Sequence, residues 1–221
     1  MKPLAPVTSA VTAGGGDADD DISLATSAGD IDAAAITATG NDVTLNAAAS
    51  VTDGNAAATN ISAANLDATA ATGIDLDTDT DSITAVVSGT GVVDIDETDA
   101  VTLTSVTTAD GSITVDAGGT ITASVVDASN TNSDSNDISL ANTAGNVSMG
   151  TVVTGSDGDL SVESATGNIT DIAGSTITAD DTALTATLGN ITIGDNGGDA
   201  INFDSLTIVS GGATSITEDS S

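Results

Sequence analysis

The chain has 221 residues and a formal net charge of −32, which sets 33 Asp and Glu residues against a single cationic side chain, Lys2. Such a chain lacks the cations that neutralise phosphate groups, so nucleic-acid binding by the chain itself is excluded. No apolar run is long enough to cross a bilayer, and membrane insertion is not expected.

Apolar residues nevertheless make up 39% of the sequence, which argues against a disordered acidic tail. They are mostly Ala, Ile, Val and Leu, with one aromatic residue, Phe203. A wide globular core is difficult to fill without aromatic side chains, so the core is expected to be narrow.

In chain order, residues 1–20 are expected to form an extended or capping segment, residues 21–217 a single domain, and residues 218–221 a tail. Within the domain, apolar and polar residues alternate in short runs, a pattern typical of half-buried β-strands. The clearest of these runs are Ile22–Leu24, Val43–Leu45, Ile74–Leu76, Val93–Ile95, Val101–Leu103 and Ile113–Val115.

The second half of the domain carries a regular repeat of 22 residues. A Gly-Asn pair followed by an apolar residue recurs at this step, and so does an apolar column. The pairs are Gly145-Asn146, Gly167-Asn168 and Gly189-Asn190, and the column is Leu140, Val162, Leu184 and Leu206.

A short repeat with strands and no helical period predicts an all-β fold, a parallel β-solenoid with coils of about 20–22 residues. About ten coils at ~4.8 Å each would form a rod on the order of 50 Å long. General rules for strand crossovers predict a right-handed solenoid. A β-sandwich is the alternative, but it gives no reason for columns at a constant step.

The recurring corners of the form Gly-[Asn/Asp]-[Ile/Val], as at Gly29-Asp30-Ile31 and Gly167-Asn168-Ile169, resemble those of filamentous-haemagglutinin-type exoproteins and other large secreted adhesins. The resemblance covers nearly the whole domain. It implies a right-handed solenoid and an extracellular or cell-surface location.

The corner asparagines have two interpretations. Asn146, Asn168 and Asn190 each begin an Asn-x-Ser/Thr glycosylation sequon. They also occupy a fixed corner, where stacked amides are expected to hydrogen-bond along the rod. Asp30 occupies the equivalent corner, which favours the ladder.

Four aspartates alternate with apolar or hydroxyl residues, namely Asp75, Asp77, Asp79 and Asp81. On one strand they would share an outward face and repel one another unless a cation is bound. Clustered oxygen ligands are what Ca²⁺ prefers, so calcium is the one cofactor that the sequence suggests. A solvated acidic face is the alternative interpretation.

Two further features concern the outer surface and the core. Ser148, Thr170, Thr192 and Thr214 recur at the same step and form an outward hydroxyl column, a pattern compatible with ice binding. Asp171 interrupts the apolar column of Met149 and Ile193, so a bulge that turns Ile172 inward is expected, because burying a charge is costly.

Catalysis is not expected. The chain has no His, no Cys and no Arg, so the usual nucleophile and base arrangements are unavailable. Paired carboxylates remain, but a raised pKa and sugar binding both rely on apolar or aromatic pockets.

The sequence therefore predicts a structural or adhesive extracellular rod, a stalk or fibre segment of a bacterial surface protein. Its partners would be further coils of a parent chain or other copies stacked end to end, together with a cell-surface or matrix receptor. A calcium-binding or ice-binding module is the alternative function.

Overall fold

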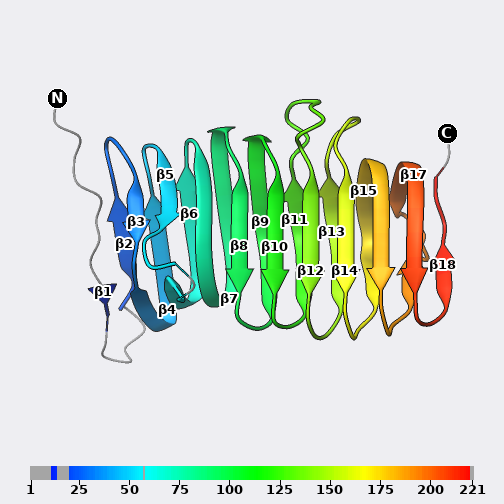
Figure 1. Cartoon of the computed structure of the whole chain (residues 1–221), viewed down its shortest axis with the longest axis horizontal. Helices are drawn as coiled ribbons and strands as arrows, with labels where there is room; N and C mark the ends of the chain where they lie inside the picture. Colours follow the sequence, from blue (N-terminus) through cyan, green and yellow to red (C-terminus); the bar gives the residue numbers. More distant parts are fainter. Residues whose placement is uncertain (1–10, 14–19, 57, 220–221) are drawn as a thin grey trace.

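The protein is an all-β solenoid of about nine turns built from stacked parallel strands, as the computed structural model in Figure 1 shows. The structure describes residues 11–13, 20–56 and 58–219, and it contains no helix within them. The predicted fold class is confirmed, with one turn fewer than the expected ten.

The strands in chain order are β1 (Val11–Thr12), β2 (Ile22–Ala25), β3 (Ile31–Ala33), β4 (Ile36–Asn46), β5 (Ser50–Asp53), β6 (Ile61–Ala70), β7 (Gly73–Thr90), β8 (Val93–Glu97), β9 (Val101–Asp110), β10 (Ile113–Ala117), β11 (Ile121–Asp127), β12 (Ile138–Asn142), β13 (Val147–Val153), β14 (Leu160–Ser164), β15 (Ile169–Ala186), β16 (Ile191–Ile193), β17 (Ala200–Ser210) and β18 (Thr214–Ile216).

These strands form two walls that face each other across a narrow core (Figure 1). The front wall contains β3, β5, the start of β7, β8, β10, β12, β14 and the ends of β15 and β17. The back wall contains β2, the end of β4, β6, the end of β7, β9, β11, β13, β16, β18 and the starts of β15 and β17. The long strands β7, β15 and β17 bend around a corner and so belong to both walls.

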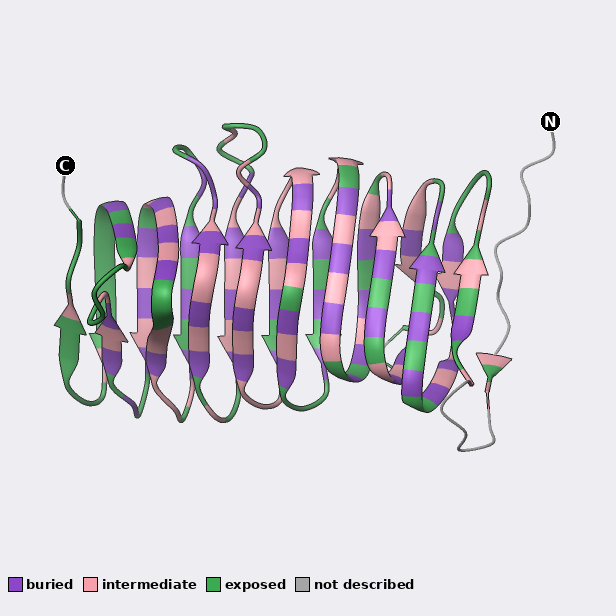
Figure 2. Ribbon diagram, turned by 180° about the vertical axis from the view of Figure 1, so that it is seen from behind, coloured by how far each residue is buried: buried purple, intermediate pink, exposed green. Residues whose placement is uncertain are grey.

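The core is filled by alternate residues of every strand, which appear as bands of buried and exposed residues along the ribbons in Figure 2. In β10, Ile113 and Val115 are fully buried while Thr114 and Asp116 face outward. The apolar core side chains are aliphatic except for Met149 and Phe203, as the composition predicts. Burial of this continuous aliphatic column is the main stabilising term of the rod.

The stacking of the predicted apolar column is confirmed for its first three members. Leu140 pairs with Val162, and Val162 pairs with Leu184, with all three side chains fully buried. The prediction is wrong for Leu206, which lies beside Thr182 and is 37% exposed, while Ile208 lies beside Leu184. The loop between β16 and β17 lengthens the last turn by two residues, so the column continues two positions later.

Loops of unequal length leave the corners of the rod without disturbing the walls. A polar loop at residues 130–137 projects between β11 and β12 at the upper edge of Figure 1. Asn136, fully buried, accepts a hydrogen bond from the Gly111 N–H and donates to Thr131. This buried amide ties the loop to the preceding turn.

Described residues on both sides of the predicted domain, residues 21–217, form hydrogen bonds with its strands. Most of the expected N-terminal segment, residues 1–10 and 14–19, lies outside the described residues, but Val11 and Thr12 pair with β4. Of the expected tail, Glu218 accepts a hydrogen bond from the Phe203 N–H at 2.8 Å. Among the described residues, no helix is long and apolar enough to cross a membrane.

Candidate functional site

The Gly-Asn corners lie directly over one another and form a hydrogen-bonded ladder along the rod. Asn146 Oδ1 accepts from the Asn168 N–H and Asn168 Oδ1 accepts from the Asn190 N–H, both at 2.8 Å. Asn190 Oδ1 accepts from the Ala213 N–H at 2.7 Å and extends the ladder by one turn. The corners therefore form a ladder along the rod, but each bond joins a side-chain carbonyl oxygen to a backbone N–H of the next turn, and not two stacked side-chain amides as the sequence suggested.

The glycines of these corners are required by close approach of successive turns. A Cβ added at Gly167 would lie 1.9 Å from the Gly145 carbonyl oxygen, and one at Gly189 would lie 1.8 Å from the Gly167 oxygen. Gly145 also has a positive φ of 83°, in the left-handed region that glycine adopts at little cost. The Gly-Asn signature is therefore a packing requirement of the stack.

A second ladder, which the sequence analysis missed, runs along the opposite corner. Asp137 Oδ1 accepts from the Asp159 N–H at 3.0 Å, and Asp159 Oδ1 accepts from the Asp181 N–H at 3.2 Å. Asp181 Oδ1 in turn accepts from the Ser205 hydroxyl. These aspartates also recur at 22 residues, and this recurrence was the signal available in the sequence.

We expect Asn168→Ala to lower the free energy of unfolding by about 1–2 kcal/mol, because the Asn190 N–H loses its acceptor. Asn168→Asp should cost less than about 0.5 kcal/mol, since a carboxylate oxygen replaces the carbonyl oxygen, as Asp30 does for the Ser50 N–H. Urea denaturation of the two variants checks this. Equal destabilisation by both would contradict a ladder that needs only an acceptor.

The four aspartates predicted as a calcium row do not share one flat face. Asp75 and Asp77 lie on the front wall, where they pair with Asp94 and Asp96 of β8. Beyond them β7 turns the corner to pair with β6 and β9, so Asp79 and Asp81 face a different direction. All four aspartates occupy outward positions of one strand, as predicted, but the strand bends between Asp77 and Asp79, and calcium binding at these residues stays a prediction.

Like charges on adjacent turns give the front wall a strongly acidic surface. Burial and the neighbouring carboxylates Asp53 and Asp96 raise the pKa of Asp75 and of Asp77. Burial, then Asp75 and Asp96, likewise raise the pKa of Asp94. The sole cationic side chain of the sequence, Lys2, lies outside the described residues. The wall therefore carries mutual repulsion, which solvent cations or protonation of these carboxylates would relieve.

Among the described residues, Glu97 is the one fully buried acidic side chain, with 4% of its surface exposed. It accepts hydrogen bonds from the Thr78 and Thr80 hydroxyls, at 2.8 and 3.0 Å, and from the Thr80 N–H. Burial raises its pKa, while these hydrogen bonds act to lower it. Its carboxylate oxygen also lies within 4.8 Å of those of Asp79 and Asp99.

We expect the protein to become more stable as the pH falls from neutrality toward the ordinary aspartate pKa of 3.8. Groups with raised pKa values bind protons more tightly in the folded state, so their ionisation destabilises the fold as the pH rises through those values. Asp94→Asn should therefore stabilise the protein at pH 7 by about 0.5 kcal/mol. Thermal melts between pH 4 and pH 8 check both, with Asp67→Asn on the back wall as the control. A melting temperature that falls steadily on acidification would contradict the repulsive wall.

A bulge in β15 brings a second acidic group together at the end of the back wall. The register shifts opposite Met149 and Thr151, so the predicted bulge is present, but Ile172 is 38% exposed and does not point inward. Asp171 stays beside Met149 with one buried oxygen that has no hydrogen-bond partner. Its nearest carboxylate oxygens, from Asp195 and Asp199, lie within 4.8 Å.

The pKa values of Asp171 and Asp199 are shifted in opposite directions. Burial and the neighbouring Asp199 raise the pKa of Asp171, which the Ser175 hydroxyl partly offsets. Burial also acts to raise the pKa of Asp199, but the Asn196 and Gly174 N–H groups outweigh it and the net direction is down.

The outward hydroxyl column is continuous over three turns of the back wall. Ser148, Thr170 and Thr192 are paired in register, and the Thr170 hydroxyl donates to Ser148 Oγ at 3.2 Å. Thr214 is not its fourth member, because Thr192 pairs with Ser215 in the lengthened last turn. Ice binding along this column stays a prediction.

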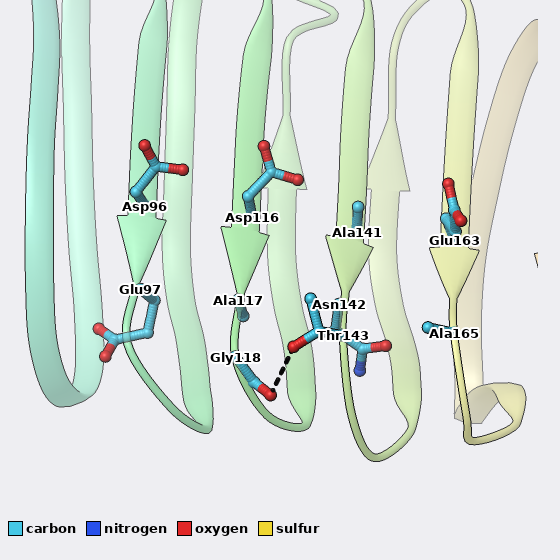
Figure 3. A pocket seen from close by; sticks show the side chains of 10 residues that line it. All are labelled: Asp96, Glu97, Asp116, Ala117, Gly118, Ala141, Asn142, Thr143, Glu163 and Ala165. Atoms are coloured by element: carbon cyan, nitrogen blue, oxygen red, sulfur yellow. Dashed lines mark hydrogen bonds between the residues drawn. The ribbon is translucent and has the colours of Figure 1, made fainter. Parts of the chain in front are cut away.

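A groove lies at the corner of the front wall where β8, β10, β12 and β14 end (Figure 3). It has a volume of about 420 Å³. We call it the corner groove, and its lining is Asp96, Glu97, Asp116, Ala117, Gly118, Ala141, Asn142, Thr143, Glu163 and Ala165. Its lining includes four acidic residues and three alanines.

Comparison with known proteins adds no relative to this picture. No family model, curated protein or solved structure matches the chain. The resemblance to filamentous-haemagglutinin-type exoproteins therefore rests on the corner motifs alone.

Proposed function

We propose that the protein is a rod-forming structural segment of a bacterial extracellular or surface protein, which lengthens by stacking its end turn on another solenoid turn. The proposal is supported by the fold, in which every strand pairs only with the turns before and after it. Such an array builds length and stiffness from one repeating unit.

The observation that carries the proposal is the exposed end of the last described turn. Ile208 belongs to the same inward-facing column as the fully buried Leu184, yet 40% of its surface is exposed. Leu206 lies in the neighbouring inward column and is likewise uncovered, and Figure 2 shows the exposed stretch of β17 at the C-terminal end of the rod. In a solenoid the surface that fits such an end is another turn of the same kind, supplied in the isolated protein by a second copy.

The acidity fits a role outside the cell, where salt and divalent cations screen the charge of −32. The same repulsion keeps neighbouring rods apart laterally and leaves end-to-end contact as the favoured association. Adhesion would then use the outward faces of the walls, and the number of stacked turns would set the length of the rod.

Electron microscopy and sedimentation of the purified protein test the proposal. At physiological salt we expect rods that lengthen with protein concentration. Ile208→Asp should hold the rods at single-copy length, because it places a charge in the contact. Thr207→Asp, at the adjacent outward-facing position, is the matched control and should leave elongation intact. A strictly monomeric particle over a wide concentration range would refute end-to-end stacking.

A further inference from the structure

The last described turn leaves an open strand edge at the C-terminal end of the rod (Figure 1). From Leu206 to Ser210, β17 pairs with β15 on one side, and no strand of the described chain pairs with its other edge. On the back wall, β18 pairs with β16 and has no described strand beyond it. We call these two edges together the open end. An unpaired edge of this kind is a template for a further strand.

The N-terminal end of the rod also has strands that pair on one side, but its inward side chains are covered. Within the described chain, β2 pairs only with β4 and β3 only with β5. Ile22 and Ile31 are nevertheless 6% and 1% exposed. β1 pairs with the start of β4, and its Val11 packs against the core. By contrast Leu206, the last member of the inward row that begins with Ile31, is 37% exposed.

Charge also distinguishes the two ends. No acidic or basic residue occurs from Ser205 to Thr217, the stretch that forms the open end and the corner between its strands. At the covered end, Asp21, Asp30 and Asp32 lie in or beside β2 and β3. A second copy of the chain is itself a polyanion with a charge of −32. Contact between two open ends brings uncharged strand edges together, whereas contact with the covered end brings aspartates into the interface.

We infer that the open end binds the open end of a second copy, so that two rods join tail to tail around a two-fold axis. This inference rests on the proposed end-to-end stacking and names the surface that receives the open end. The last-turn strands of the two copies run antiparallel, and each edge supplies the hydrogen-bond groups that the other lacks. An axis at Thr207 places Leu206 of each copy against Ile208 of the other, which buries both. Because each copy has one open end, association stops at two copies.

The mass of the full chain, measured by sedimentation and light scattering over a wide concentration range at physiological salt, tests this inference. We expect the mass to rise from that of one copy to that of two and then to stay constant. Growth beyond two copies would overturn tail-to-tail contact and leave end-to-end stacking standing. A monomer at every concentration would refute both.

Salt provides a second readout, because acidic residues border the open end. Asp204 precedes the uncharged stretch, and Glu218 and Asp219 follow it and bond to the start of β17. These charges repel across a tail-to-tail contact, so higher salt should tighten the dimer. A dimer that dissociates as the salt concentration rises would contradict a contact between two apolar edges.

Single cysteines identify which ends meet, since the natural sequence has none. Thr207→Cys places a thiol on the outward face of the open end, and a short bismaleimide should join two such chains. Asp32→Cys lies in the same outward row at the covered end and should give no self-linked product. In a mixture of the two variants, a product that joins one to the other would show head-to-tail stacking and overturn the inference.

Ile208→Asp, added to Thr207→Cys, separates a specific contact from random collision. The charge lies in the contact, so the self-linked product should fall about tenfold or more. Far-ultraviolet circular dichroism shows whether the double variant keeps its fold, and Ile208→Ser replaces Ile208→Asp if it does not. An unchanged yield from a folded variant would mean that the open ends do not bind each other.

Discussion

Val162→Asp is expected to abolish folding at room temperature. Val162 is fully buried between Leu140 and Leu184, and no cationic side chain exists among the described residues to pair with a carboxylate there. An unpaired buried charge costs at least about 4 kcal/mol, a large part of the stability of a typical domain. Circular dichroism and urea denaturation provide the measurement.

Ser161→Asp is the matched control for Val162→Asp. Ser161 is exposed on the front wall, one residue away, and receives the same added charge. It should cost less than about 1 kcal/mol. If the two variants were equally stable, the assignment of inward and outward positions along β14 would be wrong, since a slip of one residue exchanges the two faces.

Gly167→Ala is expected to lower the free energy of unfolding by about 3 kcal/mol. The added methyl group would lie 1.9 Å from the Gly145 carbonyl oxygen, which is backbone and cannot move aside alone. Overpacking of this kind displaces the neighbouring turn and weakens the Asn146 to Asn168 hydrogen bond beside it.

Gly197→Ala provides the control for Gly167→Ala, because no atom lies within 4 Å of a Cβ added at Gly197. Its cost should stay within about 0.5 kcal/mol. Thermal or urea denaturation of the pair checks the difference. A tolerated alanine at Gly167 would mean that the turns do not approach at this corner as described.

The sequence predicts the fold well because one physical requirement repeats in every turn. Each turn must place aliphatic side chains over those of the turn before it, and Leu140, Val162 and Leu184 record this directly. The Gly-Asn corners record a second requirement, close backbone approach with a side-chain acceptor for the next N–H. Both requirements make the same residue types recur at a fixed step of 22 residues, which is visible in the sequence.

The errors arise where loop length changes. Extrapolating the step placed Leu206 and Thr214 in columns that Ile208 and Ser215 occupy, because the loop after β16 is longer than its counterparts. Lengthening a surface loop costs little free energy. Extra loop residues are therefore tolerated without a compensating change elsewhere, and the sequence pattern does not reveal where the register shifts. Ile172 was misplaced for a related reason, since the bulge in β15 carries extra residues out of the wall rather than into the core.

The polar residues of the core could not be identified from alternation alone. Period two places Glu97 and Asn142 inward, but an inward carboxylate or amide is acceptable only where nearby groups satisfy it. For Glu97 those groups are Thr78 and Thr80 of the preceding turn, which the sequence does not show to be neighbours. The unpaired oxygen of Asn142 and the corner groove appear only in three dimensions.

A disulfide across one turn tests the central claim, in-register stacking of successive turns, most directly. The protein has no cysteine, so an introduced pair has no competitor. Ser148→Cys with Thr170→Cys joins positions whose hydroxyl oxygens lie 3.2 Å apart, and this pair should oxidise readily in the folded protein. Ser148→Cys with Thr192→Cys spans two turns and should remain reduced within one molecule. Rapid intramolecular oxidation of the two-turn pair, or its failure in the one-turn pair, would contradict the stacked solenoid.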